Sequence, residues 1–163
     1  MTALLAIRAD EVNFPLFLHV LGAMLLIGTL LAVASAIVLG WRRSDPDQSI
    51  ALTRFGLWTL IAGVLPSYVL MRIGAQWVEA EEFGDLEGAA KEAVEDSWWI
   101  GIGYITADLG ALLILISIVL AIIGLRRTRR GGGTGLGRVV GIISVLLLAA
   151  YIVAVWAMTT KPI

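Results

Sequence analysis

Four long apolar stretches, separated by short polar connections, make up most of the chain. They run roughly over residues 14–40, 51–76, 98–125 and 139–160. Each is long enough to cross the hydrocarbon core of a bilayer, which takes about 20 helical residues. A stretch inside lipid must be helical, because no water is there to satisfy free backbone groups. The pattern predicts an all-α fold: a four-transmembrane-helix bundle that forms a single integral membrane domain over residues 1–163.

Proline and glycine modify the expected helices. Pro66 removes one backbone hydrogen bond from the second stretch and should kink it. Small residues let membrane helices approach one another closely. Glycines lie within the stretches at positions 22, 28, 56, 63, 101, 103 and 110. We therefore expect tight packing between the helices.

Charge is segregated between the connections. The first and third connections and their borders hold eight arginines, at positions 42, 43, 54, 126, 127, 129, 130 and 138. The opposite side carries four basic residues: Arg8, Arg72, Lys91 and Lys161. The second connection, residues 79–97, contains eight acidic residues. By the positive-inside rule, the arginine-rich loops face the cytoplasm, and both termini and the acidic loop 79–97 lie outside the cell (plasma) membrane.

The ends of the stretches carry further signals. Tryptophans gather at membrane interfaces, and this orientation places Trp77, Trp98, Trp99 and Trp156 near the outer interface and Trp41 at the inner one.

The first stretch is longer than the apolar core of a signal peptide and has no basic start before it, so we expect a retained membrane anchor.

A possible internal repeat links the two arginine-rich borders. AIVLGWRR at 36–43 is similar to AIIGLRR at 121–127, which could reflect two parallel helical hairpins or only two similar loop borders.

Composition supports a membrane protein and narrows its chemistry. Hydrophobic residues make up 59% of the chain and charged residues 15%, against about 25% charged in soluble proteins. The absence of cysteine excludes disulfides, thiolate metal sites, iron–sulfur clusters and covalently attached haem. No catalytic triad, HExxH motif or nucleotide-binding loop occurs, so an enzyme is disfavoured. The expected partners are the lipid bilayer and a homo-oligomer or larger membrane complex, and not nucleic acid.

Ionisable residues inside the stretches are the candidate functional groups, because a charge within a membrane is costly. His19, Arg72 and Asp108 all fall in the expected outer half, with Asp108 the deepest. Tyr68 and Tyr104 precede Arg72 and Asp108 by four residues and share their helical faces. Tyr151 lies at about the depth of Asp108. The candidate ligand-binding pocket therefore comprises His19, Tyr68, Arg72, Tyr104, Asp108 and Tyr151. Two alternatives remain open for Arg72: an ion pair with Asp108, or a side chain that reaches the interface.

His19 is the only histidine of the chain. A neutral imidazole can ligate haem iron or copper. A haem held between histidine and methionine would need Met71 or Met158, and a bis-histidine haem would need a homodimer. The alternative is a histidine hydrogen-bonded to a neighbouring helix. Haem b and copper are therefore the cofactors to test.

Two short motifs carry a family resemblance. The first stretch contains FLHVLGAMLLIG at 17–28, and the chain ends with VWAMTTKPI at 155–163. Together they resemble small four-helix bacterial integral membrane proteins of unknown function that are loosely copper-resistance-protein-D-like. The resemblance implies a four-span fold over the whole chain. It also implies haem or copper at a histidine within a span, a role that only His19 matches here.

The sequence therefore leads to one principal hypothesis and one alternative. The principal hypothesis is a multi-pass membrane protein with a small outward-facing polar pocket, which could bind haem or a metal or serve as an accessory subunit of a membrane complex. The alternative is a proton-coupled or small-solute transporter that uses Asp108 and Arg72. The sequence also predicts that the inner half of the bundle is nearly pure hydrocarbon and that the outer half holds every buried polar group, which argues against a simple through-channel and favours an outward-facing pocket.

Overall fold

A computed structural model of the protein describes residues 10–84, 88, 97–130 and 135–159. These residues form the helices α1 (Asp10–Trp41), α2 (Pro46–Thr59), η1 (Leu60–Val64), α3 (Leu65–Phe83), α5 (Trp98–Arg129) and α6 (Gly135–Thr159). Because α2, η1 and α3 follow one another without a break, the described residues make four rods. Each rod is long and apolar enough to cross a membrane. The predicted all-α bundle of four membrane-spanning helices is confirmed.

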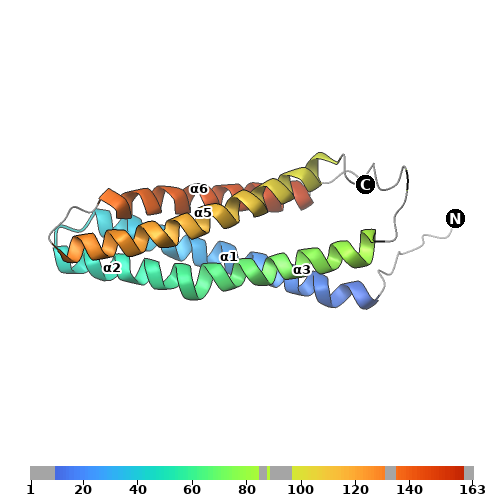
Figure 1. The fold of residues 1–163 in the computed structure, drawn as a ribbon, viewed down its shortest axis with the longest axis horizontal. Coiled ribbons are helices and arrows are strands. Elements are labelled where there is room, and N and C mark those ends of the chain that lie inside the picture. The colour runs from blue at the N-terminus through green and yellow to red at the C-terminus, as the bar shows by residue number, and fades with distance from the viewer. Residues whose placement is uncertain (1–9, 85–87, 89–96, 131–134, 160–163) are drawn as a thin grey trace.

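The rods run antiparallel to their neighbours in a long bundle (Figure 1). α1 packs against α2, α3 and α6, while α5 packs against α6, α2 and η1 and touches α3 only sparsely. One end of the bundle, called the acidic end, holds the start of α1, the end of α3, the start of α5 and the end of α6. The other end, called the arginine end, holds the α1–α2 turn and the end of α5.

The helix boundaries differ from the predicted stretches mainly at the acidic end. The acidic connection was expected to begin at Glu79, but α3 continues to Phe83. Glutamate is a good helix former, and the Trp77 indole donates a 3.2 Å hydrogen bond to Glu81 one turn later. At the other end, α2 begins at Pro46, where the Asp45 side chain accepts a hydrogen bond from the amide of Asp47. Three glutamates of the expected loop therefore belong to a helix, and most of the rest of the loop lies outside the described residues.

The expected kink at Pro66 takes the form of a π-helical turn. Proline cannot donate to the carbonyl four residues earlier, and its ring crowds that carbonyl. The helix widens just before it: η1 spans Leu60–Val64, and the Leu65 amide donates to the carbonyl of Leu60, five residues back. The membrane-spanning rod thus continues through the proline with one wide turn.

Glycines bring α1 and α3 into backbone contact. A Cβ atom built on Gly22 would collide with the backbone of Met71, and one built on Gly74 would collide with the backbone of His19. No side chain therefore separates the two helices at this level. The predicted close approach of helices at glycine positions is confirmed at Gly22. At Gly28 and Gly101 an added Cβ atom would meet no atom of a neighbouring helix within 4 Å.

α5 and α6 meet along a seam of small residues spaced seven apart. Gly110, Ser117 and Gly124 on α5 run against Tyr151, Ser144 and Gly137 on α6. A Cβ atom on Gly110 would collide with the Tyr151 hydroxyl, and one on Gly124 would lie 3.6 Å from the Gly137 amide nitrogen. Both serines are fully buried. A seven-residue repeat keeps one face of each helix turned to its neighbour.

The core between the rods is aliphatic. α1 contributes Leu26, Leu30, Val33 and Ile37 at helical spacing, and all are almost completely buried. Large apolar side chains also cover the outer surface of the rods, among them Met24, Ile105 and Leu146. An exposed surface of this kind is typical of helices that contact lipid.

We expect Gly22→Ala to destabilise the protein, because its methyl group must force α1 away from the Met71 backbone. Overpacking of this kind costs roughly 1–3 kcal/mol. Gly28→Ala is the matched control on the same helix and should leave stability unchanged or slightly raised, because alanine favours helix and nothing lies nearby. Thermal unfolding midpoints in detergent measure both. Equal effects of the two substitutions would contradict the glycine-mediated contact.

Candidate functional site

The side chains predicted to form one pocket come from all four rods. His19 lies on α1, Tyr68 and Arg72 on α3, Tyr104 and Asp108 on α5, and Tyr151 on α6. They separate into three groups, each at a different helix–helix boundary. The α3–α5 boundary holds the charged residues.

Arg72 and Asp108 form an ion pair between α3 and α5. The Arg72 Nη2 atom lies 2.9 Å from Asp108 Oδ1. The Arg72 side chain is 24% exposed and the Asp108 side chain 66% exposed. Asp108 is eight residues into the apolar segment that begins at Ile100, which at 1.5 Å per residue is about 12 Å from its end. A largely uncovered carboxylate at this depth is unusual for a membrane-spanning helix.

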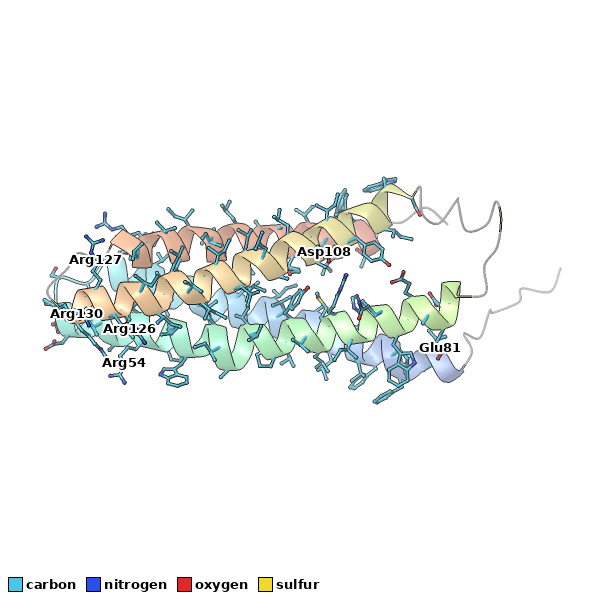
Figure 2. All side chains as sticks on the ribbon, viewed as in Figure 1. Arg54, Glu81, Asp108, Arg126, Arg127 and Arg130 are labelled. Carbon is cyan, nitrogen blue, oxygen red and sulfur yellow. The ribbon has the colours of Figure 1, made fainter. Side chains whose placement is uncertain are left out.

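Tyr104 and Glu79 extend this ion pair toward the acidic end. The guanidinium carbon of Arg72 lies 5.6 Å from the centre of the Tyr104 ring, within the range of a cation–π contact. The Tyr104 hydroxyl in turn donates a hydrogen bond to the Glu79 carboxylate. The four residues Arg72, Glu79, Tyr104 and Asp108 are called the α3–α5 polar site below. Figure 2 shows Asp108 on the side of α5 that faces α3.

Glu79 is the member of this site that the sequence reasoning missed. It was assigned to the outer loop together with the other acidic residues. The spacing along the chain indicates its place: residue 79 lies seven positions after Arg72, and therefore on the same helical face if the helix continues that far. The polar site accordingly carries one cationic and two anionic side chains.

His19 belongs to the α1–α3 contact and not to the α3–α5 polar site. Its Nδ1 atom lies 3.0 Å from the backbone carbonyl oxygen of Met71. A carbonyl only accepts hydrogen bonds, so the ring proton lies on Nδ1 and a neutral ring keeps its lone pair on Nε2. This geometry corresponds to the alternative in which the histidine binds a neighbouring helix. The bond ties together two helices that already touch at Gly22 and Gly74.

Haem does not fit between His19 and Met71. The iron of such a haem would lie between the two side chains, with the porphyrin between α1 and α3. The backbones of these helices are in contact at this level, and the Met71 side chain is buried. No group of three histidine, aspartate or glutamate side chains that could hold a metal occurs among the residues that the structure describes. The Met158 side chain is outside that set.

Tyr151 lies at the α5–α6 seam. It is 5% exposed, and its hydroxyl contacts Gly110 without a hydrogen-bond partner among the described residues. It therefore fills space beside a glycine, within electrostatic reach of Tyr68 and Arg72. Tyr68 is half-buried and packs against the hydrophobic core. For these two tyrosines the shared pocket stays a prediction.

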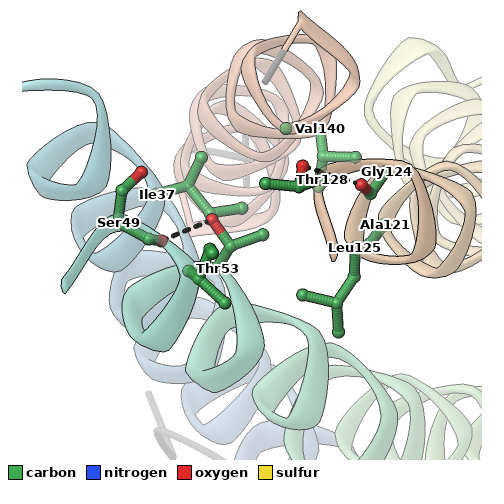
Figure 3. A pocket seen from close by; sticks show the side chains of 10 residues that line it. Ile37, Ser49, Thr53, Ala121, Gly124, Leu125, Thr128 and Val140 are labelled. Carbon is green, nitrogen blue, oxygen red and sulfur yellow. Dashed lines mark hydrogen bonds between the residues drawn. The ribbon is translucent and has the colours of Figure 1, made fainter. Parts of the chain in front are cut away.

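A small enclosed cavity lies at the arginine end, where the sequence predicted only hydrocarbon. Its volume is about 20 Å³, enough for roughly one water molecule. Thr53, Thr128 and Ser49 line it together with aliphatic side chains from α1, α5 and α6 (Figure 3). Thr53 and Thr128 donate to carbonyls of their own helices, at Ser49 and Gly124. Ser117 and Ser144 are fully buried near the middle of α5 and α6, on the side of the arginine end, so the expectation that the outer half holds every buried polar group is wrong.

Comparison with known proteins gives no further identification. No protein-family model, curated protein or solved structure matches the chain.

We expect Arg72 and Asp108 to be energetically coupled. Asp108→Asn or Arg72→Gln alone leaves an unpaired charge in the apolar segment and should lower stability by about 1–2 kcal/mol. The double variant removes both charges and should cost less than the sum of the single variants. Unfolding midpoints of the four proteins in lipid–detergent micelles measure the coupling. If the effects of the two single substitutions add up to that of the double variant, the ion pair contributes nothing to stability.

Proposed function

We propose that the chain is an integral protein of the cell membrane that transports protons coupled to a small polar solute, through the α3–α5 polar site. The observation that carries the proposal is the Asp108 side chain, which is 66% exposed although it lies within an apolar segment and pairs with Arg72. Carboxylates within membrane spans are typical of proton and ion pathways. A carboxylate so little covered by its own chain can receive protons from water or a solute beside it.

The ion pair supplies a chemical mechanism. Protonation of Asp108 removes its negative charge and frees Arg72, which keeps its contact with Tyr104. α3 and α5 touch little elsewhere, so the ion pair and the Tyr104–Glu79 bond are their main links toward the acidic end. Loss of the ion pair would therefore allow α3 and α5 to move apart. A polar solute that hydrogen-bonds Arg72 would compete for the same guanidinium, which couples solute binding to protonation.

The proposed orientation places the acidic end outside the cell. Its support is the arginine distribution: Arg42, Arg43, Arg126, Arg127 and Arg130 all lie at the opposite end. This follows the positive-inside rule. The α3–α5 polar site then lies nearer the outer surface, where protons and solutes enter.

Proton flux tests the proposal. Proteoliposomes that contain a pH-sensitive dye should dissipate an imposed pH gradient faster than protein-free liposomes. Asp108→Asn should reduce the protein-dependent rate at least about tenfold, because the amide cannot carry the proton. Glu81→Gln is the control, since Glu81 contacts Trp77 and not the polar site. Absence of flux in the wild type, or unchanged flux in Asp108→Asn, would refute proton transport through this residue.

Cysteine labelling tests the orientation. The chain has no cysteine, so a single introduced thiol reports one position. Ala80→Cys at the acidic end should react with a membrane-impermeant maleimide on intact cells. Ser44→Cys at the arginine end should react only after the cells are opened. Both positions are exposed. The reverse labelling pattern would invert the topology.

An accessory subunit of a membrane complex is the second candidate. The same exposed Asp108 favours it, because a partner helix that carries a hydrogen-bond donor or a cation could cover the carboxylate. Purification in a mild detergent distinguishes a transporter from an accessory subunit. A partner that copurifies at fixed stoichiometry, and is lost in Asp108→Asn, would support the subunit. The copper-resistance-protein-D-like resemblance would instead place haem or copper at His19, where no group of three histidine, aspartate or glutamate side chains occurs among the described residues.

A further inference from the structure

One face of α5 changes from apolar to cationic toward the arginine end. Leu112, Ile116, Val119 and Ile123 follow one another at spacings of four, three and four residues, so they share a helical face. Their side chains are 38–55% exposed. The same spacing continues to Arg126, Arg127 and Arg130. The α5 face thus presents about three turns of lipid-accessible hydrocarbon followed by a group of three guanidinium side chains.

A surface hollow marks the point where the two parts meet. It is an open depression of about 390 Å³, lined by Ile123, Arg126, Arg127 and Arg130. The three arginines lie at the arginine end of the bundle in Figure 2. None of them forms an ion pair with a carboxylate in the part of the chain that the structure describes. Cationic side chains therefore surround an open space, and no carboxylate of the described residues pairs with them there.

We propose that this hollow binds the phosphate of an anionic phospholipid, whose acyl chains lie along the α5 face from Ile123 to Leu112. Guanidinium groups bind phosphate oxygens through paired, charge-assisted hydrogen bonds. Clustered arginines beside a membrane span attract anionic headgroups. The adjoining hydrocarbon favours a lipid over a free phosphate ion, because Ile123 both lines the hollow and begins the apolar part of the face.

This site is separate from the α3–α5 polar site. Arg126 lies 18 residues beyond Asp108 on the same helix, which corresponds to about 27 Å. The lipid proposal needs only that α5 spans a membrane, and it holds whether or not the protein transports protons. Arg42 and Arg43 lie at the same end of the bundle in the α1–α2 turn and Arg54 lies there on α2, and they provide a charge-matched control.

The first experiment uses the unmodified protein. Native mass spectra are recorded from detergent micelles that contain equal amounts of phosphatidylglycerol and phosphatidylcholine. The protein should retain phosphatidylglycerol about tenfold or more over phosphatidylcholine, because the choline cation offsets the attraction of the arginines. Equal retention of the two lipids would overturn the proposal. So would displacement of phosphatidylglycerol by millimolar inorganic phosphate, which would indicate a site for free anions.

The second experiment assigns the lipid to the hollow. The triple variant Arg126→Gln, Arg127→Gln and Arg130→Gln should lose the preference for phosphatidylglycerol. The triple variant Arg42→Gln, Arg43→Gln and Arg54→Gln removes the same charge from the same end and should keep it. Loss of preference in both variants would indicate a response to total charge and would overturn the site. If the first triple variant does not fold, the three single variants replace it, and each should lower the preference severalfold.

Discussion

The direct contact between the backbones of α1 and α3 is the constraint on which the rest of the bundle depends. Gly22 and Gly74 leave no side chain between the two helices, and the His19–Met71 hydrogen bond joins them at the same level. α3 is therefore held by α1. α5 is held by α6 along the small-residue seam. The sparsely packed boundary between α3 and α5 is bridged near the acidic end by polar side chains.

This division of the boundaries explains why the charged residues collect where they do. At the α1–α3 and α5–α6 boundaries the helices are too close to enclose an arginine and a carboxylate. The α3–α5 boundary has room for long side chains, and Arg72 can reach Asp108 there at 2.9 Å. Tyr104 covers the guanidinium from one side, which partly replaces the water that an arginine loses in a membrane.

Features that depend only on the order of apolar and charged residues along the chain could be predicted from the sequence. Hydrophobic length located the four membrane-spanning rods, and Arg72 and Asp108 could be named as a possible pair because they are oppositely charged residues inside the spans. The neighbours of each side chain could not be predicted in this way. Helical periodicity gives the face on which His19 or Tyr151 lies, but not the rotation of that helix against its neighbours. For that reason His19 and Tyr151 were grouped with Asp108, whereas they contact Met71 and Gly110.

Two other differences between the predicted and the observed structure have local causes. Acidic residues near the end of a span suggested a loop, but glutamates favour helix and let α3 reach Phe83, which brought Glu79 to the polar site. The buried Ser144 could not be foreseen as polar core, because a serine is compatible with apolar surroundings when it bonds to its own helix. Ser144 does so by donating to the carbonyl of Val140.

The wide turn at Leu60–Val64 has a consequence for how this polar site could have arisen. A π-turn holds one residue more than the α-helix it interrupts, and each residue advances a helix by about 100°. α3 is therefore rotated by that amount relative to a continuous α-helix from Pro46. Without the extra residue, the Arg72 side chain would face a different neighbour instead of Asp108. A single inserted codon in an ancestral gene could thus have converted an apolar hairpin into one that carries a membrane-embedded ion pair.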